Sequence, residues 1–156
     1  MVKINCDEAR FTAENRAGIG VVIRDSEGMV LGSLSKQIPH PYNPLEIEAM
    51  AIATTVQFAL DLGFQHAILE TDSLVLVKAL HDDIEFLLAM GLVLNEIRSM
   101  VNLFNELHYS HVKRESNIVA HKLAHHAICV SGAIVWMENV PPLLFPVVSA
   151  DIASFT

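Results

Sequence analysis

Three acidic residues, Asp7, Glu48 and Asp72, lie at or near the ends of predicted strands and helices, where their carboxylates could bind a cation. Asp7 follows the alternating apolar residues of Val2–Cys6, Glu48 lies one turn into a predicted helix, and Asp72 follows the short apolar run 66–71. A carboxylate at the end of a buried strand is costly unless it caps a turn, pairs or binds a cation. Clustered oxygen ligands favour Mg²⁺ or Mn²⁺, and two such ions can activate a water against a phosphodiester. The three acids are therefore candidate metal ligands.

Each acid also has an ordinary structural explanation. Asp7 could cap the loop that follows it, and Glu48 could be a first-turn acid that the helix dipole favours. Asp72 could be the N-cap of a helix that begins at Ser73. Spacing alone does not choose, because a phosphoacceptor domain or another α/β domain with an acidic pocket has the same pattern.

The elements that must position these acids follow from hydrophobic periodicity and turn residues. Asn43, Pro44 and Glu46 predict the start of a helix that ends near Gly63. The sequence predicts strands at 2–7, 18–23, 29–38, 66–72 and 107–112, and further helices at 73–80, 91–104 and 116–128.

This order predicts an α/β fold with a mixed five-stranded sheet and helices on both faces. The first three strands form an antiparallel meander, and parallel strands follow. One domain is expected over residues 1–130. Residues 131–156 form an apolar tail with three prolines, which we expect to pack back on the domain as extended chain.

Composition limits the class of protein. The apolar fraction of 52% excludes a disordered chain, and no apolar run is long enough for a membrane span. No secretory signal is recognisable, so we expect an intracellular protein, cytoplasmic or nuclear. Cys6 and Cys129 lack metal-type spacing, and both are expected to be buried as small hydrophobic residues.

The net charge of −8 is unevenly distributed. Residues 41–110 carry two positive and ten negative side chains, whereas positive and negative charges balance on either side of this segment. This pattern argues against a broad electrostatic grip on nucleic acid. It leaves room for a local acidic site filled by divalent metal.

Five blocks of the sequence resemble the ribonuclease H-like domain, in the order and spacing of that family. More narrowly, they resemble the plant group related to the reverse-transcriptase ribonuclease H segments of retroelements. The similarity covers about Lys3 to Ala127. The blocks are 3–9, 17–25 with Gly28, Glu48–Ala51, Glu70–Ser73, and His111–Asn117 with the helix that follows to Ala124.

The resemblance implies a metal-dependent endonuclease, a hydrolase that cuts the RNA strand of an RNA–DNA hybrid with two ions, Mg²⁺ or Mn²⁺. It implies catalytic and metal-binding roles for Asp7, Glu48 and Asp72, and it aligns His121 with the family's fourth acid. Neutral imidazole can bind a metal, but it favours softer ions than Mg²⁺. A surface or capping histidine is the alternative for His121.

Other positions also depart from the family. Glu8 replaces the glycine usual after the first acid. The loop near the last strand carries Lys113 and Arg114, which together with Asn117 are candidate nucleic-acid-binding residues, although a solvated loop arginine explains Arg114 as well. The stretch 80–85, where some relatives carry a basic protrusion, is acidic.

Two alternatives to an active nuclease therefore stay open. One is a domesticated retroelement domain that binds nucleic acid but cuts weakly or not at all. The other is a protein-interaction module, which the acidic middle segment and the apolar tail suggest.

Overall fold

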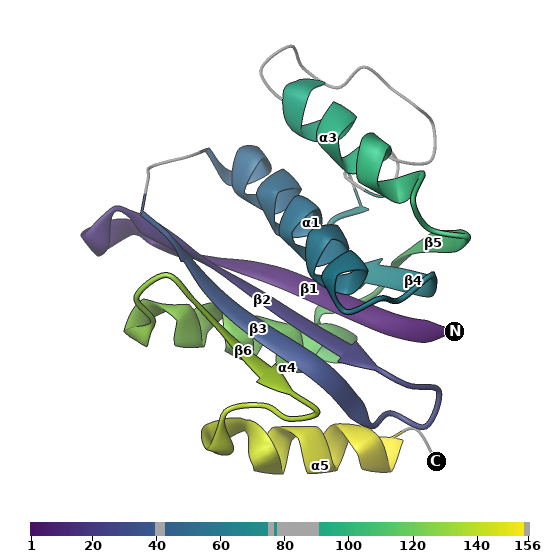
Figure 1. Ribbon diagram of the computed structural model, residues 1–156. Helices are drawn as coiled ribbons and strands as arrows, with labels where there is room; N and C mark the ends of the chain where they lie inside the picture. The colour runs from purple at the N-terminus through teal and green to yellow at the C-terminus, as the bar shows by residue number, and fades with distance from the viewer. Residues whose placement is uncertain (40–42, 75–76, 78–90, 155–156) are drawn as a thin grey trace.

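The centre of the fold is a mixed sheet of six strands in the order β5-β4-β1-β2-β3-β6 (Figure 1). The computed structural model describes residues 1–39, 43–74, 77 and 91–154. The strands are β1 (Val2–Phe11), β2 (Arg16–Arg24), β3 (Val30–Ile38), β4 (His66–Thr71), β5 (Glu106–His111) and β6 (Ala133–Met137). The predicted α/β class, with a mixed sheet, is confirmed.

The antiparallel meander forms where local turn residues predict it. β1 pairs with β2, and β2 pairs with β3 through a hairpin. In that hairpin Oδ1 of Asp25 accepts the backbone N–H groups of Glu27 and Met29 at 2.9 and 3.0 Å. Gly28 supplies the positive φ of 87° that the turn needs.

The predicted end of the first strand at Asp7 is wrong, because β1 continues to Phe11. The continuation pairs with the start of β2, from Glu8 opposite Ile19 to Phe11 opposite Arg16. What stops before Asp7 is the parallel pairing with β4, which runs only as far as Asn5. Asp7 therefore lies inside a strand but beside the carboxyl end of β4.

Helices cover both faces of the sheet, as predicted (Figure 1). α1 (Pro44–Asp61) and α3 (Gly91–Val101) lie over one face, and α4 (Ile118–His126) and α5 (Phe145–Ser154) lie over the other. Asn43 caps α1 as expected, because its side chain accepts the Glu46 N–H at 2.8 Å. The predicted helix at 73–80 and the acidic stretch 80–85 lie largely outside the described residues.

The C-terminal segment differs from the expected extended tail. Residues 133–137 form the sixth strand, antiparallel to β3, and α5 follows. Apolar residues drive this arrangement, because Val140, Leu144 and Val148 share one buried cluster with Val22 of β2 and with α4. The segment thus adds a strand to the sheet and a helix to its α4 face.

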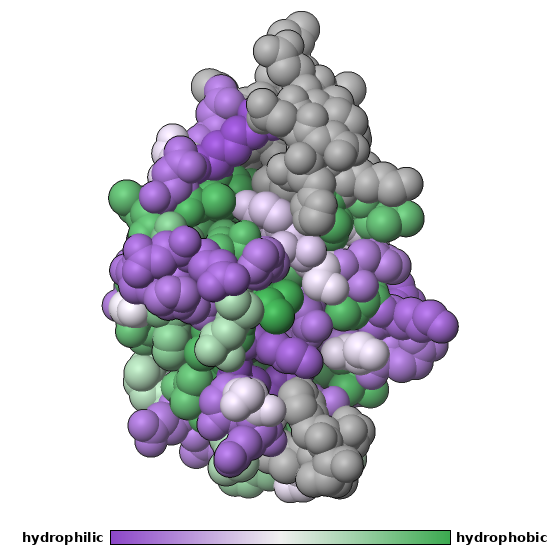
Figure 2. Space-filling model, turned by 90° about the vertical axis from the view of Figure 1, so that its right-hand side faces the viewer, coloured by the Kyte–Doolittle hydropathy of each residue, from purple (hydrophilic) through white to green (hydrophobic). Residues whose placement is uncertain are grey.

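Two further surface properties follow from the structure. Cys6 is buried as predicted, but the prediction for Cys129 is wrong, because its side chain is exposed in the 3₁₀ turn that follows α4. No helix among the described residues is long and apolar enough to cross a membrane. On the face drawn in Figure 2, which is the right-hand side of Figure 1, hydrophilic side chains separate the apolar patches.

α4 rests directly on the backbone of β2 at Gly18 and Gly20. A Cβ atom added at Gly20 meets the carbonyl oxygen of Ala120 and lies 2.7 Å from Cβ of Leu123. A Cβ at Gly18 meets the carbonyl oxygen of Ala124. Only glycine permits this approach, since the obstructing atoms belong to the helix backbone.

We therefore expect Gly20→Ala to lower the free energy of unfolding by about 1–3 kcal/mol, because the helix must shift away from the strand. Urea unfolding, followed by the fluorescence of the single tryptophan, Trp136, measures the change. Gly32→Ala on β3 is the matched control, since its Cβ meets side-chain ends and no backbone: Cδ1 of Leu62 at 3.0 Å and Cζ of Phe58 at 3.5 Å. Equal losses in the two variants contradict the close-packing explanation.

Candidate active site

Asp7 lies on the α4 face of the sheet, where the backbone and a histidine hold its carboxylate. Its side chain is 5% exposed. Oδ1 accepts the backbone N–H of Glu8 at 2.9 Å, and Oδ2 lies 2.9 Å from Nδ1 of His121. Because a carboxylate only accepts hydrogen bonds, His121 carries its proton on Nδ1 in this pair.

Glu48 and Asp72 approach from two other elements. Glu48 is half-buried in the first turns of α1, and Oγ of Ser73 donates a hydrogen bond to its Oε2 at 3.1 Å. Asp72 directly follows β4, between Thr71 and Ser73, and Oγ1 of Thr71 accepts the Ser73 N–H at 3.2 Å. The hydrogen bond of Ser73 thus ties the start of α1 to the end of β4.

The carboxylates act on one another electrostatically. Burial, and then the charge of Asp72, raise the pKa of Asp7, although its hydrogen bonds with Glu8 and His121 oppose the rise. Burial also raises the pKa of Glu48, and the charges of Asp72 and Asp7 add to this. Sharing one electrostatic environment, the acids repel one another in their charged forms.

Glu8 adds a fourth acid to this environment. Burial raises its pKa to about 8, and the charges of Asp7, Glu48 and Asp72 contribute in that order. Sequence reasoning noted Glu8 only as a departure from the family's glycine. Glu8 directly follows Asp7 in β1, so the two side chains point to opposite faces of the sheet. Both lie in the part of β1 that extends beyond its pairing with β4.

The donor chemistry of this cluster fits a hard divalent cation, since carboxylate oxygens dominate and a cation relieves their repulsion. The acids do not form a closed cage, because the described residues contain no group of three or more His, Cys, Asp or Glu side chains placed to hold a metal ion. The structure thus brings the predicted residues into one region without defining the coordination of an ion.

His121 also contacts a second histidine on α4. The ring centroids of His121 and His125 lie 4.4 Å apart, with the planes tilted by 59°. Burial lowers the pKa of His125, and the neighbouring His121 adds to the effect. The contact was missed from the sequence, although the spacing of four residues on a helix predicts it.

The three predicted nucleic-acid-binding residues lie in different surroundings. Lys113 and Arg114 are exposed at the start of the 3₁₀ turn η2 (Arg114–Asn117). Asn117 is 1% exposed. Its Nδ2 donates to the carbonyl oxygen of Cys6 at 2.8 Å, and its Oδ1 accepts from Nδ2 of Asn5 at 3.1 Å. The contacts of Asn117 in the structure are therefore internal, and its contact with nucleic acid stays a prediction.

Asn5 connects this amide pair to a buried charge. Its Oδ1 accepts a hydrogen bond from Arg24 of β2 at 3.0 Å, and its Nδ2 also lies 3.1 Å from Oε1 of Glu70. Arg24 is 3% exposed and forms an ion pair with Asp151 of α5. The network therefore connects β1, β2, β4 and α5 through residues that are far apart in sequence.

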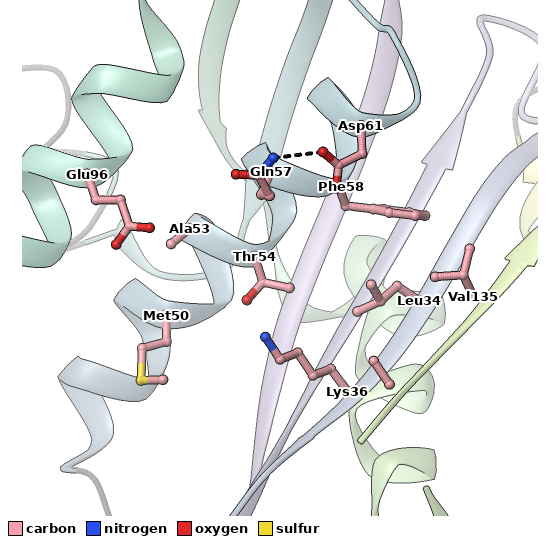
Figure 3. Close-up of a pocket in the computed structure, with 11 residues that line it drawn as sticks. Leu34, Lys36, Met50, Ala53, Thr54, Gln57, Phe58, Asp61, Glu96 and Val135 are labelled. Atoms are coloured by element: carbon pink, nitrogen blue, oxygen red, sulfur yellow. Dashed lines mark hydrogen bonds between the residues drawn. The ribbon is translucent and has the colours of Figure 1, made fainter. Parts of the chain in front are cut away.

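A pocket of about 560 Å³ lies elsewhere, between α1, α3 and the β3–β6 edge of the sheet. In Figure 3, Thr54 and Phe58 of α1 face Lys36 and Leu34 of β3 across it, and Glu96 of α3 stands at one side. None of the candidate acids lines it. The chemistry of the acid cluster therefore belongs to a different part of the surface.

A model of the reverse transcriptase-like family matches residues 5–127. The chain belongs to this family. The match includes all four candidate metal ligands and ends before β6, so the C-terminal strand and helix lie beyond the family's matched region. No curated protein is significantly similar to this chain in sequence.

Solved structures show the ribonuclease H-like fold. RNase H1 from the archaeon Halobacterium salinarum is 22% identical, with a TM-score of 0.75 over 82% of this chain and 97% of its own. LC11-RNase H1 in complex with an RNA/DNA hybrid is also 22% identical, with a TM-score of 0.72 over 83% and 97%. The prototype foamy virus protease–reverse transcriptase is 18% identical, with a TM-score of 0.63 over 84% of this chain and 21% of that longer chain. The predicted fold family is therefore confirmed.

We expect Asp151→Asn to lower the free energy of unfolding by about 1–3 kcal/mol, because it removes the carboxylate that is ion-paired with the buried Arg24 and leaves Glu70 as a charged neighbour. Urea unfolding measures the loss. Glu14→Gln, which also removes one negative charge but at an exposed position, is the control. Equal stability of the two variants contradicts a structural role for the ion pair.

Proposed function

We propose that the domain is a metal-dependent endoribonuclease that hydrolyses the RNA strand of RNA–DNA hybrids. The observation that carries the proposal is the convergence of acids from three elements, with His121 hydrogen-bonded to Asp7 and Ser73 to Glu48. The mutual charge effects among Asp7, Glu48 and Asp72 support it. Membership of the reverse transcriptase-like family supports the same reaction class.

In this proposal Asp7 would hold both of two ions, Glu48 and Asp72 would each hold one, and His121 would complete the second site. Mg²⁺ or Mn²⁺ ions, when bound, supply an activated water and stabilise the leaving oxygen of the phosphodiester. The protein contributes orientation. The Glu8 N–H fixes one oxygen of Asp7, and the Ser73 hydroxyl fixes one oxygen of Glu48.

In this proposal the exposed basic side chains that follow β5 bind the hybrid. Lys113 and Arg114 stand on the turn that leads into α4, the helix that also carries His121. An arginine there can contact a phosphate through two parallel hydrogen bonds, whereas a lysine acts as a point charge. The acidic balance of the whole chain keeps this grip weak.

The origin of the domain is part of the same proposal. We infer that it is a plant protein of the group derived from retroelement reverse transcriptases. The sequence blocks around the acids support this, as does the fold shared with part of the prototype foamy virus protease–reverse transcriptase.

A labelled RNA–DNA hybrid tests the activity directly. We expect metal-dependent cleavage of the RNA strand, and a loss of about 100-fold or more in Asp7→Asn, because that change removes a charge at the centre of the cluster. Glu14→Gln retains full activity, because its side chain is exposed in the 3₁₀ turn Thr12–Glu14, past the end of the strand that carries Asp7. A folded protein that binds hybrid but does not cut it with Mg²⁺ or Mn²⁺ rules out the enzyme.

A second candidate is a nucleic-acid-binding domain that no longer cuts. Two features favour it. His121 engages Asp7 where the family has an acid, and Glu8 places a side chain beside Asp7 where the family has glycine. In this case hybrid binding persists and weakens as salt rises, without cleavage. The absence of any salt-dependent affinity for hybrid or duplex favours a protein-interaction module instead.

The substitution His121→Asp separates the two candidates. For an enzyme, we expect the rate with Mg²⁺ to rise about tenfold relative to the rate with Mn²⁺, because a carboxylate suits the harder ion better than imidazole does. The measurement is the ratio of initial cleavage rates with each ion. If the variant folds, binds hybrid and still cuts with neither ion, the binding-only domain is favoured.

A further inference from the structure

His121 and His125 form a matched pair on one face of α4. They are four residues apart, which places their side chains one above the other on a helix. Their centroids are 4.4 Å apart and their planes are tilted by 59° rather than stacked in parallel. Two histidines four residues apart on one helix face can each direct a nitrogen toward a single ion, at the usual zinc–imidazole bond length of about 2.1 Å.

The carboxylate of Asp7 fixes the orientation of the first ring. Nδ1 of His121 carries the proton that Asp7 accepts, so Nε2 presents its lone pair. Metal-binding histidines commonly donate their other N–H to a carboxylate, which sets the tautomer and makes the ligand more basic. The burial of Asp7 makes it a rigid support for this arrangement.

The second ring is also held in place and is open to solvent. The edge of Phe11 packs against His125, with centroids 6.3 Å apart and an interplanar angle of 68°. His125 is exposed, and the side chain of His121 is 32% exposed. An ion can therefore reach both rings from solvent without displacing the core.

We propose that His121 and His125 bind one divalent transition-metal ion of the Zn²⁺ type, with water in the remaining positions and Asp7 supporting His121 from behind. Imidazole nitrogens suit Zn²⁺, Ni²⁺ and Cu²⁺, whereas carboxylate oxygens suit Mg²⁺. The pair thus selects a different class of ion from the acids around Glu48 and Asp72. Both proposals use His121 and Asp7, but the Zn²⁺ titration needs neither nucleic acid nor cleavage, so its failure is distinguishable from the failure of the proposed nuclease.

Isothermal titration of Zn²⁺ into the protein without nucleic acid tests the site. The titration uses the Cys129→Ser background, because the exposed thiol of Cys129 could bind zinc by itself. We expect one ion per chain, and a loss of affinity of about tenfold or more in His121→Gln and in His125→Gln. A large excess of Mg²⁺ leaves the binding unchanged.

His126→Gln is the matched control, because His126 is on the same helix but its ring lies against Trp136 instead. It should retain the affinity of the parent. Asp7→Asn should weaken binding about tenfold, since it removes the carboxylate that orients His121. As a second measurement, Zn²⁺ should raise the melting temperature of the parent protein but not that of His125→Gln.

Four outcomes overturn the proposal. They are no Zn²⁺ binding by the parent protein, binding that survives the loss of both histidines, an equal loss in His126→Gln, and displacement of the ion by Mg²⁺. Circular dichroism of each variant without metal shows whether it is folded. A His121→Gln or His125→Gln protein with the parent's spectrum and no Zn²⁺ binding supports the site.

Discussion

The close contact of α4 with the backbone of β2 is the constraint on which the rest of the structure depends. Gly18 and Gly20 leave no side chain between the strand and the helix, so the helix lies where Ala120 and Ala124 touch the sheet. At that depth His121 comes within hydrogen-bonding distance of Asp7 on the neighbouring strand. A larger residue at either glycine moves the helix outward and separates this pair.

The acid cluster depends on the sheet in another way. β1 loses its parallel partner after Asn5, and β4 ends two residues before Ser73, so a polar region opens between them. α1 enters this region with its capped first turns, which bring Glu48 to the Ser73 hydroxyl. The carboxylates repel one another because the fold brings β1, α1 and the end of β4 together, since no two of the three predicted acids are near neighbours in the sequence.

Local signals explain what the sequence could predict. The Asn43 cap, the turn ending at Gly28 and the alternation in the first strand each depend on neighbouring residues, and the elements formed as expected. Long-range features were missed. Nothing near Asn117 indicates that it pairs with Asn5, and nothing near Arg24 indicates a partner on α5. The sixth strand was missed for the same reason, because β6 is defined by its pairing with β3.

The ion pair of Arg24 and Asp151 also bears on how the chain reaches this fold during synthesis. Arg24 belongs to the second strand made, whereas Asp151 lies in the last helix. The meander can form early from local pairings, but the carboxylate that is ion-paired with Arg24 arrives only when α5 has left the ribosome. Contacts between such distant segments form slowly. The acid cluster on β1, β4 and α1 is thus assembled on a sheet whose own charge balance is completed last.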